Sequence, residues 1–229
     1  RESIVAGVKI LMKVMNVSKA YIGIEDNKKQ AIDAMKQAFA LTDVEVVSLP
    51  TRYPQGGEKM LIKAITGREV PSGNLPADVG VVVQNIGTAI AVSDAVIKGI
   101  PLIERIVSIT GGAIKEPKNL LIRVGTSFKD AIDYCGGFKE TPDKLIMGGP
   151  MMGIAQFSLV TPVIKGTSGI LALTKSETNE SKESPCIRCG KCVDACPMGL
   201  NPSMLSILGE KSFCIEAKED FSLFDCIEC

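Results

Sequence analysis

The sequence predicts three successive modules: an α/β domain with a largely parallel sheet, a small β-grasp unit, and a cysteine-rich C-terminal domain. In the first hundred residues short apolar strands alternate with helical patterns of about ten residues, which is typical of a parallel α/β layer. Two strands, a helix and a further strand then follow one another closely. Seven of the eight cysteines lie between Cys186 and Cys229.

Composition restricts the classes of function. The 229 residues include 26 basic and 26 acidic side chains and are 45% hydrophobic, so the chain can form a globular core but has no net charge to hold a nucleic acid. The richest apolar stretch, 79–97, is interrupted by polar residues and predicts no membrane span. The absence of histidine excludes imidazole as a general base, proton shuttle or metal ligand. Because Arg1 follows no leader pattern and the chain stops at Cys229, we expect a fragment of a longer, non-secreted protein, cut at both ends.

The first module, residues 1–103, contains amphipathic helical periods separated by apolar strands. An apolar residue recurs every three or four positions in each helical segment, and the strand segments are short and bounded by polar turns. The predicted helices are 2–15, 28–41, 58–66 and 88–98, and the predicted strands are 21–24, 44–49 and 80–83.

The second module, residues 104–173, is predicted as the β-grasp unit. Its strands are 104–110, 119–124 and 144–147, and its helix, 127–135, is capped by Ser127 and ended by Gly136 and Gly137. Residues 170–173 supply a further strand either to this unit or to the first module. Residues 174–184, rich in Ser, Thr, Glu and Lys, are predicted as a linker before the C-terminal domain, 185–229.

The cysteines of the C-terminal domain have the spacing of an iron–sulfur segment. Cys186, Cys189, Cys192 and Cys196, followed by proline, form the C-x₂-C-x₂-C-x₃-C-P pattern of bacterial [4Fe–4S] ferredoxins. In two-cluster proteins the fourth cysteine binds the other cluster, so a second segment is expected, and Cys226 and Cys229 supply its first half. The remaining ligands would then lie beyond Cys229. The apolar run 204–208 predicts a helical domain.

A structural zinc site is the alternative to iron–sulfur clusters. It would use the pairs Cys186/Cys189 and Cys226/Cys229, but zinc leaves Cys192 and Cys196 unexplained. Cys135 and Cys214 fit no ligand spacing, and we assign them no function because free cysteines commonly behave as small apolar residues.

Two polar loops in the first module are candidate anion or flavin sites. Gly56, Gly57 and Glu58 follow a strand and open a helix, and Gln84, Asn85 and Thr88 occupy the same place before the next helix. Free N–H groups at a helix start can receive an anion, and ligands bind at the carboxyl ends of parallel strands. A plain surface turn explains the glycines equally well, and helix capping explains Asn85 and Thr88.

Six motifs together identify a family resemblance. The chain resembles, almost end to end, the C subunits of Rnf ion-translocating electron-transport complexes, and more distantly it is similar to the flavin-bearing, NADH-oxidising subunit of respiratory complex I. The motifs are YIGIEDNK at 21–28, YPQGGE at 53–58, VQNIGT at 83–88, ITGG at 109–112, MGGPMMG at 147–153 and the cysteine segment from Cys186.

The resemblance implies a Rossmann-like domain for FMN and NAD(H), a β-grasp domain of the soluble-ligand-binding type, and a helical ferredoxin-like domain for two [4Fe–4S] clusters. It places Gly56, Gly57 and Glu58 at the flavin and nicotinamide, and Gln84, Asn85 and Thr88 at the flavin phosphate. It also implies a peripheral oxidoreductase subunit at the cytoplasmic face of the cell membrane. There, membrane-embedded and ferredoxin-like Rnf subunits would be its partners, with electron transfer coupled to ion translocation. Two rivals remain: a cobalamin reductase of bacterial microcompartments, from the same family, and a non-enzymatic, zinc-stabilised binding scaffold.

Overall fold

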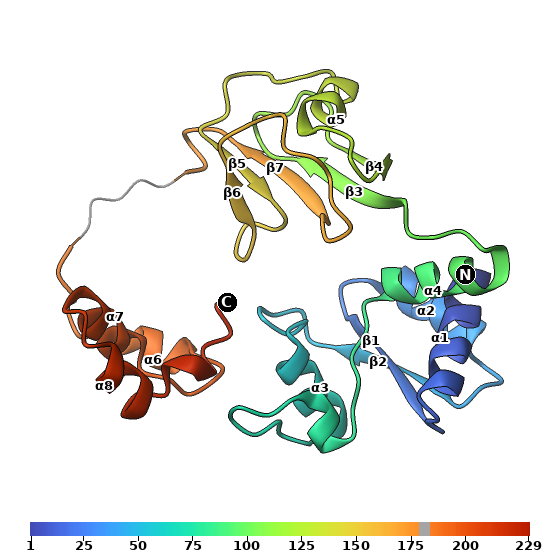
Figure 1. Ribbon diagram of the computed structural model, residues 1–229, viewed down its shortest axis with the longest axis horizontal. Helices are drawn as coiled ribbons and strands as arrows, with labels where there is room; N and C mark the ends of the chain where they lie inside the picture. The colour runs from blue at the N-terminus through green and yellow to red at the C-terminus, as the bar shows by residue number, and fades with distance from the viewer. Residues whose placement is uncertain (179–183) are drawn as a thin grey trace. The chain divides into compact units, whose positions relative to one another are not determined.

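The computed structural model describes residues 1–178 and 184–229. The chain forms two compact units, one containing Arg1–Pro101 with Cys186–Ile227 and the other containing Leu102–Pro185 with Glu228–Cys229 (Figure 1). None of the described helices is long and apolar enough to span a bilayer.

The α/β part of the first unit is built on a two-stranded parallel sheet. Strands β1 (Ala20–Glu25) and β2 (Val44–Leu49) pair in register from Ala20 opposite Val44 to Glu25 opposite Leu49. Helices flank the sheet on both sides, as Figure 1 shows. They are α1 (Glu2–Val14), α2 (Lys29–Ala38), α3 (Glu58–Thr66) and α4 (Ile86–Lys98), with a 3₁₀ turn η1 at Pro76–Val79.

The two faces of this sheet are covered by different helices. Met35 and Phe39, in and just after α2, form a buried cluster with Val44, and Ile22 packs against that cluster. On the other face, Gly23 leaves room for α3, because a Cβ added there would lie 3.0 Å from the Leu61 side chain. The sheet is therefore covered on both faces, as parallel strands require.

Helices α1 and α4 pack backbone to backbone. A Cβ added at Gly7 would lie 2.6 Å from the carbonyl carbon of Ala89, closer than real Cβ atoms come. Gly7 is thus the residue that allows the two helices to approach, and both it and Ala89 are buried.

The predicted strand at 80–83 is wrong. Gly80 ends η1 in a left-handed conformation with φ +70°, and the Val81 amide donates back to the Pro76 carbonyl at 3.1 Å. This backbone amide is hydrogen-bonded within the preceding turn, so it does not donate to a neighbouring strand. In the described residues β1 and β2 pair only with each other, and the segment joins neither.

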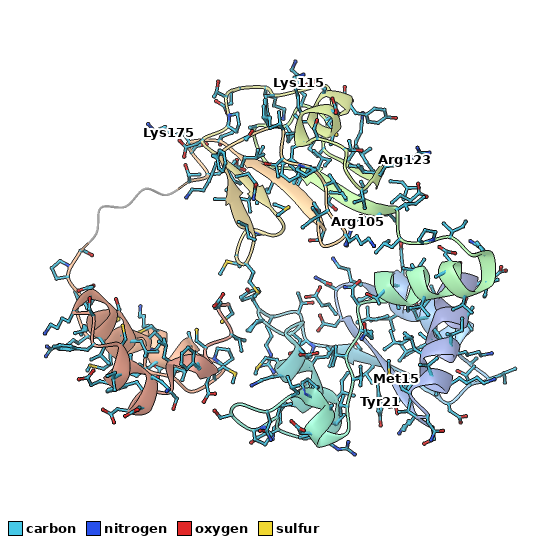
Figure 2. The ribbon with its side chains drawn as sticks, viewed as in Figure 1. Met15, Tyr21, Arg105, Lys115, Arg123 and Lys175 are labelled. Carbon is cyan, nitrogen blue, oxygen red and sulfur yellow. The ribbon has the colours of Figure 1, made fainter. Side chains whose placement is uncertain are left out.

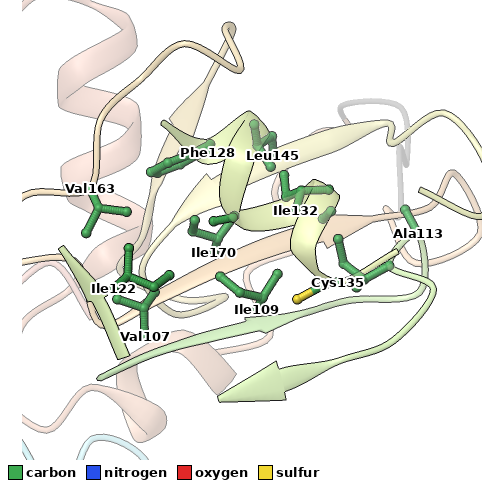
Figure 3. Close-up of a cluster of buried hydrophobic side chains, with 13 residues drawn as sticks. Val107, Ile109, Ala113, Ile122, Phe128, Ile132, Cys135, Leu145, Val163 and Ile170 are labelled. Carbon is green, nitrogen blue, oxygen red and sulfur yellow. The ribbon is translucent and has the colours of Figure 1, made fainter. Parts of the chain in front are cut away.

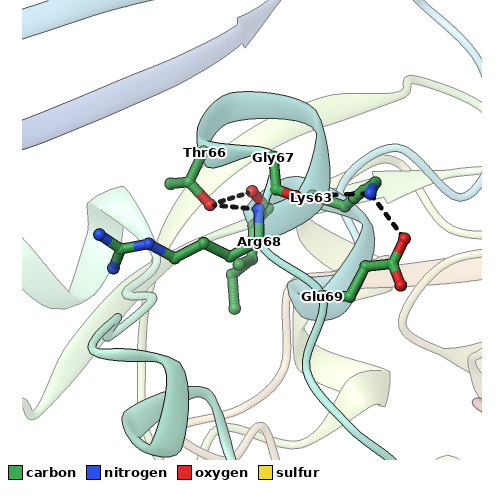
Figure 4. A network of polar contacts seen from close by, with 6 residues as sticks. Lys63, Thr66, Gly67, Arg68 and Glu69 are labelled. Atoms are coloured by element: carbon green, nitrogen blue, oxygen red, sulfur yellow. Dashed lines mark hydrogen bonds and ion pairs between the residues drawn. The ribbon is translucent and has the colours of Figure 1, made fainter.

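The C-terminal end of α3 is fixed by local polar contacts (Figure 4). Gly67 caps the helix at φ +72°, and Lys63 reaches both its carbonyl oxygen, at 3.4 Å, and the Glu69 carboxylate, at 2.6 Å. Thr66 donates its hydroxyl to the Ile62 carbonyl and accepts from the Arg68 amide. These bonds satisfy the carbonyl oxygens of Ile62 and Gly67 at this end of the helix.

The second unit has a five-stranded mixed sheet with one helix on it. The strand order is β4-β3-β7-β5-β6, with β3 and β7 parallel and the other pairs antiparallel. Figure 2 shows Arg105 and Arg123 on the neighbouring strands β3 and β4, and Arg105 donates to the Lys165 carbonyl. The elements are β3 (Glu104–Thr110), β4 (Lys118–Arg123), α5 (Phe128–Tyr134), β5 (Lys144–Met147), β6 (Ile154–Gln156) and β7 (Gly169–Leu173).

The core of this unit lies between the sheet and α5. Phe128, Ile132 and Cys135 from the helix segment pack on Ile109 and Ile170 from the central strands, all fully or almost fully buried (Figure 3). The predicted strand at 170–173 therefore belongs to this sheet, between β3 and β5, and not to the first module. The sequence prediction missed β6, which has only three residues.

The first residues of the predicted linker are bound to the sheet. The Glu177 carboxylate accepts from the Gly112 amide at 3.1 Å and the Thr174 amide at 2.9 Å, and Thr178 donates to Asp143. These bonds with backbone amides, that of Thr174 foremost, lower the pKa of Glu177. Residues 174–178 are thus hydrogen-bonded to the loops at the strand ends of the second unit, and 179–183 lie outside the described residues.

The cysteine-rich segment is helical, as its apolar run predicts. It contains α6 (Lys191–Ala195), α7 (Pro202–Glu210), α8 (Cys214–Glu219) and a 3₁₀ turn η2 (Leu223–Asp225). The Asn201 side chain caps α7 by accepting from the Met204 amide. The domain boundaries placed at 103/104, 173/174 and 184/185 remain predictions.

Candidate functional site

The carboxyl ends of β1 and β2 are tied together by one carboxylate. Oδ1 of Asp26 accepts the Thr51 amide at 3.2 Å and the Thr51 hydroxyl at 2.6 Å, while the Asp26 amide donates to the Leu49 carbonyl. The Thr51 hydroxyl holds the pKa of Asp26 below its usual value. Asp26 caps no helix, since α2 begins after Lys28 without a side-chain cap. Sequence reasoning assigned Asp26 no role of its own; two polar residues placed just after strands that end in register were the available signal.

The loop that leads from β2 into α3 is held by hydrogen bonds between its own residues. The Gln55 side chain is buried and accepts from Nε of Arg52 at 3.3 Å, and the Gly57 amide donates to the Pro54 carbonyl at 2.8 Å, after a cis Tyr53–Pro54 peptide bond. Gly57 occupies the N-cap position of α3 without a side-chain cap bond. The amides of the first turn therefore face solvent without a side-chain acceptor at the cap.

The two glycines of this loop leave different amounts of space. A Cβ at Gly56 would meet nothing within 4 Å, whereas a Cβ at Gly57 would lie 3.1 Å from the Pro54 carbonyl oxygen. Gly56 is exposed, as is Glu58. The loop consequently presents bare backbone at Gly56, where a flat ligand could approach closely.

The loop before α4 is organised by a helix cap. Oδ1 of Asn85 accepts the Gly87 amide at 2.8 Å, and the Thr88 amide donates to the Asn85 carbonyl. Gln84, Asn85 and Thr88 are all exposed. The capping role considered for Asn85 is confirmed; the Thr88 side chain takes no part in it. No hydrogen bond or ion pair joins this loop to the 52–58 loop in the part of the chain that the structure describes.

The two helix starts differ in charge. Helix α3 carries Glu58 in its first turn, while the first turn of α4 holds no acidic residue. A carboxylate stabilises the positive end of a helix but repels a phosphate brought there. The α4 start is therefore the better of the two for an anion, and the α3 start suits an uncharged ring.

The two C-x₂-C segments share one unusual backbone angle. The residue before the second cysteine is left-handed in both, with φ +54° at Arg188 and φ +53° at Glu228. Non-glycine residues rarely adopt this conformation, so its repetition at equivalent positions marks one loop type used twice. Sequence reasoning found the spacing of Cys226 and Cys229 but not this shared geometry.

Backbone amides are directed at the cysteine sulfurs. The Arg188 amide lies 3.4 Å from Sγ of Cys186, and the Leu200 amide lies 3.4 Å from Sγ of Cys196. Gly190 begins α6 in a left-handed conformation, φ +78°, between Cys189 and Cys192. N–H groups pointed at thiolates are the contacts that tune iron–sulfur centres.

Five of the six candidate ligand cysteines are exposed to solvent. Cys186, Cys189, Cys192, Cys226 and Cys229 are exposed, and Cys196 is half-buried. No three Cys, Asp or Glu side chains gather closely enough to hold a metal ion within residues 1–178 and 184–229.

The other two cysteines stand apart. Cys135 is buried in the core of the second unit, and burial raises the pKa of its thiol. Cys214 begins α8 and is exposed. Cys135 thus behaves as the small apolar residue that the sequence predicted.

Family models match two of the modules. The Nuo51 FMN-binding domain matches residues 1–94, which include both polar loops, and the SLBB domain matches residues 106–155, which include most of the mixed sheet. The α/β and β-grasp modules predicted from the sequence are therefore confirmed.

Curated relatives are similar over nearly the whole chain. The C subunit of a proton-translocating ferredoxin:NAD⁺ oxidoreductase complex from Clostridium ljungdahlii is 68% identical over 98% of this chain and 49% of its own length. The C subunit of a Na⁺-translocating ferredoxin:NAD⁺ oxidoreductase complex from Acetobacterium woodii is 54% identical over 88% of this chain and 46% of its own length. The C subunit of an ion-translocating oxidoreductase complex from Rhodobacter capsulatus is 49% identical over 90% of this chain and 40% of its own length.

The chain spans about half the length, or less, of these relatives. Its FMN-binding and SLBB modules occur in the order that the sequence motifs predict. The resemblance of the chain to the C subunits of Rnf-type ion-translocating ferredoxin:NAD⁺ oxidoreductase complexes is thus confirmed over the part that it shares with these relatives.

Proposed function

We propose that the whole protein is the peripheral electron-transfer subunit of a membrane-bound ferredoxin:NAD oxidoreductase complex. It would pass electrons between NAD(H), FMN and two [4Fe–4S] clusters at the cytoplasmic face, in a complex that couples this transfer to ion translocation. Its partners would be the membrane-embedded and ferredoxin-like subunits. The names of the relatives support this assignment, and the features below support the role of particular residues.

The α/β module supports FMN and NAD(H) binding at its two helix starts. Gly56 exposes its backbone, so the flat flavin ring and the nicotinamide can approach closely there. Glu58, in the first turn of α3, favours an uncharged ring over a phosphate at this helix start. The α4 start, with Gln84, Asn85 and Thr88 exposed and no acidic residue in its first turn, suits the flavin phosphate. These roles agree with the FMN-binding model that matches residues 1–94.

The cysteine-rich segment supports cluster binding. Cys186, Cys189 and Cys192 would hold one [4Fe–4S] cluster, while Cys196, Cys226 and Cys229 would belong to the second. When bound, FMN exchanges a hydride with NAD(H) and single electrons with the clusters. The chain itself would bind and orient these groups, and the amides of Arg188 and Leu200 would donate to the sulfurs of Cys186 and Cys196.

The observation that carries the cluster assignment is the repeated left-handed residue at Arg188 and Glu228. The test is iron and acid-labile sulfide analysis, with electron paramagnetic resonance, of the full-length protein reconstituted anaerobically. Replacing Cys186 or Cys226 by alanine should each remove about half of the iron, since each loop would serve a different cluster. Cys214→Ala is the matched control and should retain all of it.

Two results would refute the assignment. One is that the protein binds zinc in place of iron and shows no visible absorption, while Cys192→Ala binds as much metal as the unsubstituted protein. A zinc site built from two C-x₂-C pairs would behave in this way. The other is loss of the same single cluster in both variants, which would show that the two loops do not serve different clusters.

A further inference from the structure

The second unit contains a pocket that none of the roles above uses. It is an open pocket of about 550 Å³ on the β-grasp fold, bounded by the loop before β5 and the segment that follows β6. Apolar side chains form much of its wall, and two carboxylates join them. The residues that carry the argument are Phe138, Leu145, Phe157, Leu159, Glu140 and Asp143.

Apolar side chains around the pocket are unusually exposed. Phe157 is fully exposed, and Ile154 and Val160, three residues away on either side, are exposed over 64% and 77% of their surface. Met151 and Met152, just before β6, are exposed as well. Single exposed apolar residues are common on soluble proteins, but several in ten consecutive residues beside a pocket indicate a contact surface.

The charge of the pocket limits what can bind there. Glu140 and Asp143 lie in its wall, and no lysine or arginine among the residues that the structure describes lines it. Neither carboxylate forms an ion pair among the described residues; the Thr178 hydroxyl donates to Asp143. An anionic lipid surface, a nucleotide phosphate or a nucleic acid would be repelled, whereas a cation with an apolar body would be attracted.

The sheet edge beside the pocket favours side-chain docking over strand addition. Strand β6 is the last strand of the sheet, and among the described strands it pairs with β5 alone. It has three residues, and Nε2 of Gln156 covers the Ile154 carbonyl at 3.1 Å. A short edge with a covered acceptor is a poor template for a further strand, so the pocket and its apolar rim carry the recognition.

We propose that this pocket docks a segment of a partner protein in which an arginine or lysine is flanked by apolar side chains. The cation would lie between Glu140 and Asp143 and against the face of Phe157, and its apolar neighbours would cover Ile154 and Val160. Aromatic faces and carboxylates attract a cation in the same way, and arginine combines both contacts well. The inference does not depend on which cofactors the other modules hold.

The chain has no tryptophan, which allows a sensitive test. Phe157→Trp in the full chain places a single tryptophan on the rim, where full exposure makes the change tolerable. The probe is an acetylated, amidated hexapeptide of alternating leucine and arginine, compared with its twin that carries neutral citrulline in place of arginine. The arginine peptide should shift the emission to shorter wavelength in a saturable way, with an affinity on the order of 1 mM or tighter.

Charge is tested with matched variants. Glu140→Gln should lower the affinity for the arginine peptide about tenfold, which corresponds to a loss of roughly 1.4 kcal/mol of binding free energy. Glu104→Gln on β3, an exposed carboxylate outside the pocket lining, is the control and should leave the affinity unchanged. Calorimetric titration of the unsubstituted chain with the same two peptides repeats the comparison without the tryptophan.

Three outcomes would overturn the proposal. The first is equal affinity for the arginine and citrulline peptides, and the second is no saturable signal by either method up to about 5 mM peptide. The third is a larger emission shift with phosphatidylglycerol vesicles than with the arginine peptide, which would assign the apolar rim to a lipid surface.

Discussion

Replacing Gly111 by alanine should destabilise the sheet of the second unit strongly. Gly111 follows β3 at φ +111°, and a Cβ added there would lie 2.6 Å from the carbonyl carbon of Ala172 on β7 and 2.8 Å from its amide nitrogen. The same Ala172 carbonyl accepts the Ala113 amide at 3.2 Å. Alanine therefore has to push apart two strand segments that share a buried hydrogen bond.

The magnitude follows from three contributions. A non-glycine residue at positive φ costs about 1–2 kcal/mol, overpacking against backbone costs about 1–3 kcal/mol, and a disrupted buried hydrogen bond adds about 1 kcal/mol. We expect a loss of unfolding free energy of about 3–6 kcal/mol. Gly125→Ala is the matched control, because Gly125 has φ +98° but open space around its Cβ position, so it should lose only about 1–2 kcal/mol.

Hydrogen exchange, measured by mass spectrometry on peptides that cover β3 and β7, gives the free energy of opening of the second unit separately from the rest of the chain. Complete loss of protection in Gly111→Ala would agree with the prediction. Protection in Gly111→Ala within about 0.5 kcal/mol of that in Gly125→Ala would refute it, since the contact with Ala172 would then contribute nothing.

Three further predictions concern the sites. Asn85→Ala should remove the α4 cap, cost about 1 kcal/mol and raise amide exchange in the first turn of α4; unchanged exchange would contradict it. Glu177 has a lowered pKa in the folded state, so its carboxylate stabilises the fold above its ordinary pKa of 4.5 and this contribution is lost as pH falls through the lowered value. Urea unfolding of Glu177→Gln should accordingly be less dependent on pH below about 4.5 than that of the unsubstituted chain, and parallel curves would disprove the role. Gly56→Leu should weaken FMN binding to the full-length protein at least about tenfold with little loss of fold stability, because its Cβ meets open space; equal FMN affinity, measured by flavin fluorescence quenching, would show that the ligand lies elsewhere.

Periodicity predicted the elements that bury one face. Residues 44–49, 58–66, 104–110 and 144–147 form strands and a helix with the predicted bounds. Their apolar residues recur with a period of two or of three to four, and turn residues bound them, so local pattern and tertiary packing agree.

The errors arise where local pattern carries little information. Residues 80–83 are apolar enough for a strand, but a strand exists only with a partner, and the Val81 amide is already bound to Pro76. Strand β6 has three residues after a Gly-Gly-Pro turn, which is too short for alternation to be visible. The hydrogen bond from the Gly112 amide to Glu177, in the polar run 174–178, joins residues 65 apart in sequence, and the sequence analysis did not foresee it. In each case the outcome depends on pairing that a short stretch of sequence does not reveal.

The candidate sites show the same division. Spacing alone located the cysteines and both polar loops, because ligand spacing is a local property. The clamp between Asp26 and Thr51 depends on the register of two strands, and the shared conformation of Arg188 and Glu228 depends on backbone dihedral angles. Glu58 is visible in the sequence, but its effect on the charge at the start of α3 can be judged only once the bounds of α3 and α4 are known.

The most direct test of the proposed electron path is an anaerobic visible spectrum of the full-length, reconstituted protein before and after addition of NADH. The account predicts that NADH alone bleaches both the flavin bands and the broad iron–sulfur absorption, because electrons enter at the flavin and reach the clusters within the same protein. Clusters that respond only to dithionite, in a protein that binds no flavin, would contradict it and reduce the protein to an electron relay.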